Sequence, residues 1–217
     1  MSSRIHVKVC GVTSADGVAD AVAAGARYLG FNFFPPSPRA LAPDLARALM
    51  LDVPEGVAKV ALVVDPDDAL LERLLATLPA DFLQLHGHES PARVAEIRAR
   101  FGLPVIKAVG IAEVSDLAQL EAHMPVCDQI LVDAKPPRDA ELPGGNGLAF
   151  DWRLLQGRDW ARPWLLAGGL RPENVAAAIR LTGARQVDVS SGVESAPGVK
   201  DAALMQAFIR AAGEAGA

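Results

Sequence analysis

Arg4-Ile5-His6-Val7-Lys8-Val9-Cys10-Gly11-Val12-Thr13 is the stretch that bears most directly on the fold. Apolar and polar side chains alternate from residue 5 to residue 10, and this period of two predicts a β-strand with one polar face. The turn after it lacks the Gly-x-Gly-x-x-Gly motif that an open, doubly wound, dinucleotide-binding sheet places there. The sequence therefore disfavours that sheet, which is the main competing architecture.

Strand-like runs recur along the whole chain and alternate with helical patterns, such as the leucines that follow a 3.6-residue period between Leu70 and Leu78. The eight expected strands are residues 5–9, 28–33, 57–63, 81–85, 104–108, 129–132, 163–166 and 186–189. Such alternation predicts an α/β protein with a parallel sheet. Eight units in 217 residues fit a closed (β/α)8 barrel, a TIM barrel, that occupies residues 1–217 as a single domain.

The connections carry recognisable start signals for helices. Thr13 with Asp16 three residues later, and Ser90 followed by Pro91, predict helix N-termini. The sixth helix is the weakest: a Pro- and Gly-rich stretch from residue 133 to residue 150 is predicted to be a loop. Only a short segment, residues 151–155, is expected to follow it before the next strand.

The composition is that of a globular protein, with 51% hydrophobic and 22% charged residues. The net charge of −5 comes without a basic stripe, so nucleic acid is not an expected partner. No apolar run reaches the roughly 18 residues of a membrane helix, and the N-terminus lacks a signal-peptide core. We expect no membrane association, a cytoplasmic location and a monomer. The two distant cysteines, Cys10 and Cys127, argue against a disulfide scaffold or a structural zinc site.

Polar side chains stand at the ends of several expected strands. The carboxyl ends of barrel strands form the catalytic rim, so Cys10, His86, Asp133 and Ser190 are expected to meet there. Lys8 shares the inward face with Cys10, and a nearby ammonium group favours the thiolate, which can act as a base or nucleophile. Asp133 has apolar neighbours and could hold a proton for acid catalysis. Two alternatives stay open: Cys10 as a small buried hydrophobe and Asp133 as a turn cap.

Two small-residue turns follow the last two expected strands, Leu166-Ala167-Gly168-Gly169-Leu170 and Val189-Ser190-Ser191-Gly192. Backbone amides at this place in a barrel bind phosphate, although such turns can also be plain connections. Arg39 follows a proline-rich loop, and its planar guanidinium suits a substrate carboxylate, unless it is an idle surface arginine. His86 and His88 are a poor metal pair because the other histidines lie elsewhere, so no metal is expected.

Seven motifs, taken in order, span nearly the whole chain and point to one family. They are Lys8-Val9-Cys10-Gly11-Val12-Thr13, Gly30-Phe31-Asn32-Phe33 with Ser37-Pro38-Arg39, Leu83-Gln84-Leu85-His86-Gly87, Leu131-Val132-Asp133, Gly144-Gly145-Asn146-Gly147 with Phe150-Asp151-Trp152, Ala167-Gly168-Gly169-Leu170 with Pro172-Glu173-Asn174-Val175, and Val187-Asp188-Val189-Ser190-Ser191-Gly192-Val193-Glu194 with Pro197-Gly198 and Lys200-Asp201. Together they resemble phosphoribosylanthranilate isomerase of tryptophan biosynthesis. Each motif is weak alone, but seven in order at barrel spacing are specific.

The resemblance implies a (β/α)8-barrel enzyme that needs no cofactor or metal. Its reaction is an Amadori rearrangement of N-(5-phosphoribosyl)anthranilate to 1-(2-carboxyphenylamino)-1-deoxyribulose 5-phosphate. The resemblance assigns the general base to Cys10, the general acid to Asp133 and the carboxylate contact to Arg39. It also assigns Asp188 to the substrate hydroxyls, and we expect His86 to be a further substrate-binding residue. The phosphate site would comprise Gly168, Gly169, Ser190, Ser191 and Gly192.

The implied chemistry suits these residue types. Ring opening needs a proton on the furanose oxygen, and the resulting Schiff base then loses its C2 proton, so one acid and one base suffice. Other phosphate-binding barrels, such as sugar-phosphate epimerases and indole-glycerol-phosphate synthase, share the two turns. The first would need metal ligands on several strands, and the second a catalytic lysine with glutamates. A non-catalytic phosphate-binding barrel is the remaining alternative.

Overall fold

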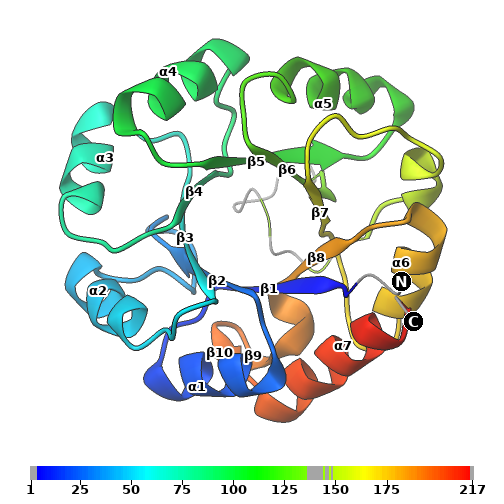
Figure 1. Ribbon diagram of the computed structural model, residues 1–217, viewed down its shortest axis with the longest axis horizontal. Helices are drawn as coiled ribbons and strands as arrows, with labels where there is room; N and C mark the ends of the chain where they lie inside the picture. Colours follow the sequence, from blue (N-terminus) through cyan, green and yellow to red (C-terminus); the bar gives the residue numbers. More distant parts are fainter. Residues whose placement is uncertain (1–3, 136–143, 145–146, 148, 216–217) are drawn as a thin grey trace.

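Strands and helices alternate along the chain, and the strands form a closed ring that the helices surround (Figure 1). The computed structural model describes residues 4–135, 144, 147 and 149–215. The ring consists of β1 (His6–Cys10), β2 (Tyr28–Asn32), β3 (Ala58–Val63), β4 (Phe82–Leu85), β5 (Val105–Ile111), β6 (Gln129–Ala134), β7 (Trp164–Leu166) and β8 (Gln186–Val189). The helices are α1 (Ala15–Ala24), α2 (Pro43–Leu51), α3 (Asp68–Leu75), α4 (Pro91–Phe101), α5 (Leu117–His123), α6 (Val175–Thr182) and α7 (Ala202–Ala215). Short 3₁₀ helices are η1 (Val114–Asp116), η2 (Trp152–Leu155) and η3 (Ser191–Val193), and β9 (Glu194–Ala196) pairs with β10 (Val199–Lys200).

Closure of the ring depends on the pairing of the first strand with the last. β1 lies parallel to β2 on one side and to β8 on the other, so that Lys8 is paired with both Tyr28 and Asp188. The strands follow one another around the ring in sequence order. The prediction of a closed (β/α)8 barrel is therefore confirmed, and the open sheet is excluded.

The strand boundaries match the predicted ones closely, except that β5 and β6 run further. Gly110 pairs with Asp133 and Ile111 with Ala134, so the two strands extend one another by mutual backbone pairing. Asp133 consequently lies inside a strand instead of after it. A strand position holds the side chain more firmly than a loop position would.

Of the two predicted helix caps, Ser90 is confirmed and Thr13 is replaced by Ser14. At α1 the cap is Ser14, whose side chain accepts a hydrogen bond from the Gly17 amide, whereas Thr13 Oγ1 donates to the Gly198 carbonyl. At α4 Ser90 caps the helix as predicted. The Thr13 side chain thus serves a long-range contact between the two ends of the barrel sequence.

The connection between β6 and β7 is the one where the sequence predicts a loop. Residues 136–143, 145–146 and 148 of that stretch lie outside the described residues. The short segment expected at residues 151–155 forms the 3₁₀ helix η2, which Asp151 caps by accepting from the Arg153 amide. The described part of this connection therefore carries a single 3₁₀ turn.

Apolar side chains form an outer layer between strands and helices and an inner layer within the ring. Phe31 and Phe208 are fully buried in the outer layer. The inner layer comprises Val60, Ile106, Ala108, Leu131, Leu165 and Ala167. The inward faces of the strands also carry the buried polar side chains of Lys8, Gln84 and Asp188. Because strand side chains alternate between the two faces, the barrel interior is partly polar.

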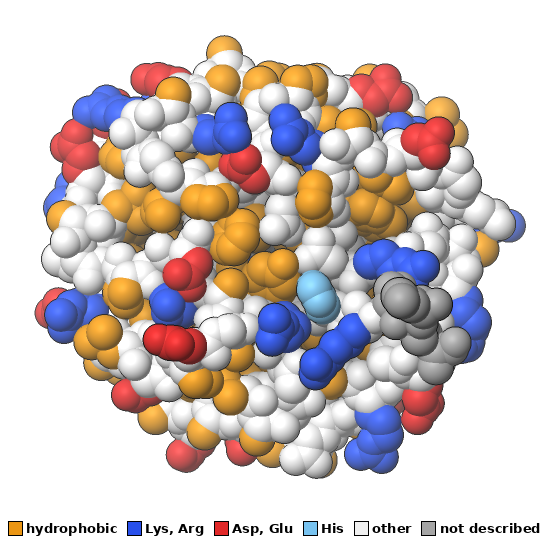
Figure 2. Space-filling view, in the orientation of Figure 1, with side chains coloured by type: hydrophobic (Ala, Val, Ile, Leu, Met, Phe, Trp, Pro, Cys, Tyr) orange, Lys and Arg blue, Asp and Glu red, His pale blue; other side chains and the backbone are white. Residues whose placement is uncertain are grey.

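The face shown in Figure 2 has hydrophobic side chains gathered over its middle and charged side chains of both signs around its edge. No continuous band of Lys and Arg crosses this face. Within the described residues, no helix is long and apolar enough to cross a membrane.

The inner layer gives a stability prediction. Ile106 is fully buried in it, so Ile106→Ala should lower the free energy of unfolding in urea by about 2–5 kcal/mol, because it leaves a cavity the rigid ring cannot close. Val114→Ala is the control, since Val114 is 67% exposed and the change should cost less than about 0.5 kcal/mol. A loss below about 1 kcal/mol for Ile106→Ala would show that the interior repacks freely.

Candidate active site

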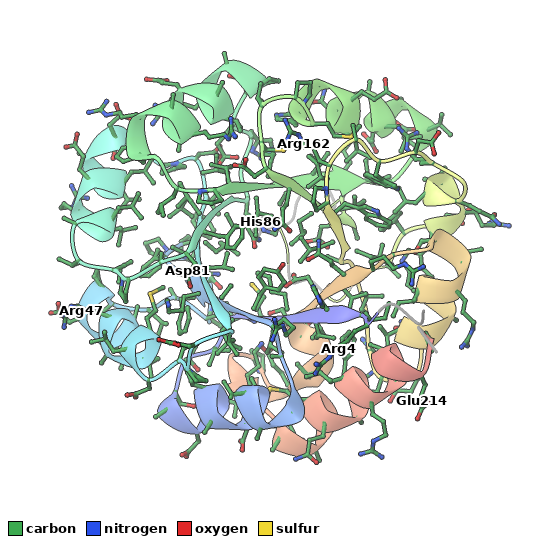
Figure 3. The ribbon with its side chains drawn as sticks, in the orientation of Figure 1. Arg4, Arg47, Asp81, His86, Arg162 and Glu214 are labelled. Carbon is green, nitrogen blue, oxygen red and sulfur yellow. The ribbon has the colours of Figure 1, made fainter. Side chains whose placement is uncertain are left out.

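The polar groups expected at the rim meet in one pocket at the carboxyl ends of the strands. Cys10 ends β1, His86 follows β4, Asp133 lies in β6 and Asp188 in β8, and all four line the pocket. Figure 3 shows His86 near the centre of the ring of strands. The pocket walls include every site residue predicted from the sequence: Cys10, Arg39, His86, Asp133, Gly168, Gly169, Asp188, Ser190, Ser191 and Gly192.

The pocket has two lobes. The Arg39 lobe is lined by Cys10, Asn32, Phe34, Ser37, Arg39, Leu62, Val64 and His86. The glycine lobe is lined by Ala134, Gly147, Ala167, Gly168, Gly169, Leu170, Val189, Ser191 and Gly192. Asp133, Gly144, Asp188 and Ser190 line both lobes. The arrangement suits an elongated ligand with an apolar, carboxylate-bearing end and an anionic end, whose middle lies against Asp133.

Cys10 and Lys8 lie next to each other on the inward face of β1, opposite Gly30, whose lack of a side chain leaves room for both. Lys8 Nζ is fully buried and donates to Asp188 Oδ1 at 2.8 Å. Burial opposes the charge on Lys8, but the Asp188 carboxylate raises the pKa of the ammonium to about 12. The ammonium group next to Cys10 is therefore permanently charged at neutral pH.

Burial raises the pKa of the Cys10 thiol, and the Lys8 ammonium offsets this only in part. The Asp188 carboxylate also raises the pKa of Cys10, because it brings a negative charge close to the sulfur. Lys8 thus favours the thiolate, as the sequence suggested, but burial and Asp188 outweigh its effect. The resting group is the thiol, and the thiolate that forms from it is a strong base.

Asp133 is held at both carboxyl oxygens. Its Oδ1 accepts a hydrogen bond from the Ala134 amide at 2.8 Å, and its Oδ2 lies 3.4 Å from His86 Nε2. The other nitrogen of the His86 imidazole, Nδ1, lies 2.8 Å from Gln84 Nε2. Catalytic contacts of this kind are often long without substrate and shorten in the complex. Gly144 lies directly over the His86–Asp133 pair, where a Cβ would collide with His86 Nε2.

Arg39 is not the free two-pronged donor that the sequence suggested. Its Nε and Nη2 both donate to the Glu194 carboxylate at 2.8 Å, and the side chain is buried. Lys200 Nζ also bonds Glu194, at 2.6 Å. Burial opposes ionisation of Glu194, yet the two cations bring its pKa down to about 2. Both hydrogens of Nη1 and one of Nη2 remain available on a guanidinium whose orientation Glu194 fixes.

The glycine lobe is built from backbone. Gly168 and Gly169 have φ values of 83° and 63°, and their amides donate no backbone hydrogen bond to another described residue. A Cβ on Gly192 would overlap the Leu170 carbonyl oxygen, so only glycine permits the two turns to approach one another. Backbone amides gathered in such turns are suited to phosphate oxygens.

The histidines other than His86 lie outside the pocket. His88 is on the surface and contacts Asp65. His123 is buried, with its ring nitrogens near the carbonyl oxygens of Gln119 and Glu89. Across the part of the chain that the structure describes, no three His, Cys, Asp or Glu side chains cluster as metal ligands would.

The fold and the pocket define a (β/α)8-barrel protein whose two-lobed pocket brings a thiol, carboxyl groups and an imidazole together. The sequence model of one family, described as N-(5'-phosphoribosyl)anthranilate (PRA) isomerase, matches residues 7–211. The chain belongs to this family. The family assignment favours the isomerase over the other phosphate-binding barrels that the two turns alone leave open.

Individual relatives agree with the family assignment. A protein of Paracoccus denitrificans (strain Pd 1222) named N-(5'-phosphoribosyl)anthranilate isomerase is 63% identical over 205 residues, which are 94% of this chain and 95% of the relative. One from Cereibacter sphaeroides with the same name is 59% identical, covering 96% of this chain and 98% of the relative. The crystal structure of phosphoribosyl anthranilate isomerase from Thermotoga maritima superposes with a TM-score of 0.87 at 35% identity, covering 96% of this chain and 98% of that one.

A further solved structure bears on the ligand. It is a phosphoribosyl anthranilate isomerase in complex with reduced 1-(o-carboxyphenylamino)-1-deoxyribulose 5-phosphate. It superposes with a TM-score of 0.84 at 33% identity, covering 96% of this chain and 98% of that one. A structurally similar barrel thus holds a phosphorylated molecule with an aromatic carboxylate.

Sequence reasoning missed Glu194, Lys200 and Gln84 as parts of the site. Glu194 and Lys200 belonged to a quoted motif, yet nothing local indicates that their partner is Arg39, which lies 155 residues away from Glu194. Gln84 also belonged to a quoted motif, but only as a polar residue between two leucines of an expected strand. An inward-facing amide at that position was the one signal available for it.

Glu194 gives a prediction about pH. Because its pKa falls from 4.5 in the unfolded chain to about 2 in the fold, its ionisation stabilises the fold above pH 4.5, and this contribution is lost as the pH falls toward 2. Glu194→Gln should lower the free energy of unfolding at pH 7 by about 1.5–3 kcal/mol, with a smaller deficit at pH 3. Urea unfolding at both pH values measures this.

Glu121→Gln is the control, because Glu121 pairs with Arg158 on the surface, and it should cost less than about 1 kcal/mol at either pH. A Glu194→Gln deficit that is the same at pH 7 and pH 3 would show that the charge of Glu194 is unimportant for stability.

Proposed function

We propose that the protein is an N-(5'-phosphoribosyl)anthranilate isomerase of tryptophan biosynthesis, which forms 1-(2-carboxyphenylamino)-1-deoxyribulose 5-phosphate by an acid–base Amadori rearrangement. The observation that carries the proposal is the two-lobed pocket, in which Asp133 and Asp188 line both lobes and Cys10 adjoins them. Membership of the isomerase family and the ligand of the similar barrel support it.

The lining of the two lobes supports one orientation of the substrate. Its phosphate would lie against the amides of Gly168 and Gly169 and the turn Ser190–Gly192. Its aromatic ring would lie among Phe34, Leu62 and Val64, with the carboxylate at Arg39 Nη1. The ribose would then span the junction, with its hydroxyls near Asp188.

Asp133 would start the reaction as the general acid. It protonates the ring oxygen as the C1–O bond breaks, which leaves a Schiff base between C1 and the anthranilate nitrogen and a carboxylate on Asp133. The Ala134 amide and His86 hold the carboxyl group at both oxygens, so little reorganisation is needed as charge develops.

Cys10 would complete the reaction as the general base. Its thiolate removes the C2 proton, and the electron pair of the C–H bond forms the C1–C2 double bond of an enolamine while the Schiff-base nitrogen becomes neutral. The enolamine tautomerises to the ketone product. The thiol first gives its proton to water, and the Lys8 ammonium stabilises the thiolate that remains. The raised pKa of the thiol lowers the fraction of the basic form but makes the thiolate a stronger base.

Both steps move protons between groups already in the pocket, so we propose that no cofactor or metal takes part. We further propose that the chain works as a single barrel domain and a monomer in the cytoplasm, with neither nucleic acid nor membrane as partner. The acidic net charge of −5 supports the exclusion of nucleic acid.

The two proton-transfer groups give a kinetic prediction. Cys10→Ala and Asp133→Asn should each lower kcat by at least about 10²- to 10⁴-fold, the usual cost of losing a general base or acid, while substrate binding changes little. Turnover of N-(5'-phosphoribosyl)anthranilate by the purified protein measures this. Cys127→Ala is the control, since Cys127 is buried away from the pocket. Near-normal turnover by Cys10→Ala would show that another group is the base, and His86 would be the first candidate.

Growth provides the test of the proposed function as a whole. A bacterial strain that requires tryptophan because it lacks this isomerase should grow without tryptophan when it expresses the chain, but not when it expresses Cys10→Ala. Failure of the well-expressed, folded wild-type chain to restore growth would refute the proposed function.

Arg39 should affect binding instead of chemistry. Its proposed contact is far from the bonds that change, so Arg39→Ala should raise KM and lower affinity by about 1.5–3 kcal/mol with little effect on kcat. Arg39→Lys should recover part of the lost affinity, because it keeps the charge but not the two parallel hydrogen bonds of the planar guanidinium to Glu194. The exposed Arg47, which Figure 3 places on the outside of α2, provides the Arg→Ala control.

Weaker binding by Arg39→Ala could come from loss of a contact with the substrate carboxylate or from a general loosening of the Arg39 lobe. A substrate analogue distinguishes the two. An analogue with a carboxamide in place of the carboxylate should bind the wild type poorly and be penalised much less by Arg39→Ala. Equal penalties in the two proteins would show that Arg39 does not contact the carboxylate.

A further inference from the structure

Gln84 is an amide in a place that favours apolar side chains. It lies on the inward face of β4, is fully buried, and has Leu62 and Ile106 as its strand-register neighbours. Its Oε1 is buried, and among the described residues no group donates a hydrogen bond to it. A buried carbonyl oxygen without a donor destabilises a fold, so an amide at this position calls for a reason other than stability.

The reason lies at the other end of the amide. Gln84 Nε2 is 2.8 Å from His86 Nδ1, and an amide nitrogen has hydrogens to donate but no lone pair to accept. Nδ1 must therefore be unprotonated for this contact to be a hydrogen bond. A neutral imidazole with a bare Nδ1 carries its proton on Nε2, which is the nitrogen 3.4 Å from Asp133 Oδ2.

The position of that proton matters for Asp133. If Nε2 were bare, it would be the most accessible base beside the acid and would draw the proton that Asp133 has to deliver to the substrate. With the proton on Nε2, His86 cannot accept another there. It can only donate to the Asp133 carboxylate that forms when the proton leaves, which stabilises the product of the transfer.

We propose that Gln84 is a positioning residue that fixes His86 in the neutral tautomer with the proton on Nε2, and so keeps the Asp133 proton for the substrate. The proposal rests on the proposed function for the role of Asp133, but the tautomer itself does not depend on it. Gln84 acts through His86 and does not line the pocket.

The tautomer can be observed directly by ¹⁵N NMR of the imidazole rings in the free protein at pH 7.5, with His86→Asn used to assign the signals. In the wild type we expect a bare Nδ1 and a protonated Nε2. Gln84→Glu replaces the donor by an acceptor and should move the proton to Nδ1. A wild-type ring protonated on Nδ1, or a Gln84→Glu ring that keeps its only proton on Nε2, would overturn the proposal.

Gln84→Met tests the consequence with a side chain of similar size. We expect kcat to fall about 10-fold, less than on loss of the acid itself, with KM changed less than about 2-fold. The thermal midpoint should stay the same or rise, because the change removes a buried oxygen that lacks a donor. A merely structural role would instead lower the midpoint and leave the kcat of the folded protein intact, which would overturn the proposal.

The matched control is Gln129→Met. Gln129 is a buried glutamine at the start of β6, where its Oε1 lies 3.4 Å from Gln186 Nε2, and it lines neither lobe. Its loss should leave kcat and the His86 tautomer unchanged. A fall in kcat equal to that of Gln84→Met would assign the effect to barrel packing and overturn the proposal. An inactive wild type with the expected tautomer would instead refute the proposed function alone.

Discussion

The ion pair between Lys8 and Asp188 joins the first strand of the barrel to the last, with Lys8 fully buried and Asp188 at the floor of the pocket. Two charges are kept away from water only because each neutralises the other, so breaking the pair would leave one of them uncompensated. The pair spans the seam at which the ring closes. It also places an ammonium group beside Cys10, so the integrity of the ring and the reactivity of the thiol depend on the same contact.

Around this pair, the site is organised by groups that hold the reacting residues in place. Glu194 occupies two nitrogens of Arg39, and Lys200 completes its neutralisation. Gln84 orients His86, which in turn faces Asp133. Arg39 and His86 are thereby each held by a residue that does not itself line the pocket. This arrangement reduces the reorganisation that proton transfer requires.

The sequence predicted what depends on local pattern. Alternation of apolar and polar residues located the strands, and their number and order were enough to predict the barrel and the shared rim. The sequence could not predict contacts that form only when β1 and β8 close the barrel. The partner of Arg39 and the sharing of the Lys8 charge with Asp188 both arise from residues more than 150 positions apart. The raised pKa of Cys10 comes first from its burial and then from the nearby Asp188 carboxylate, and both depend on the closed ring. Ser14 replaced Thr13 as a cap for the same reason, since Gly198 binds the threonine.

The distance along the chain between Lys8 and Asp188 has a consequence for how the protein is made. The two residues are 180 positions apart, so a ribosome that adds about 5–20 residues per second synthesises Lys8 roughly 10–40 s before its counter-ion. During that interval β1 has no partner on one edge, and the Cys10 thiol has not yet been enclosed. The nascent chain therefore passes through a period in which the Cys10 thiol is open to oxidants and chaperones. This period ends only when β8 leaves the exit tunnel.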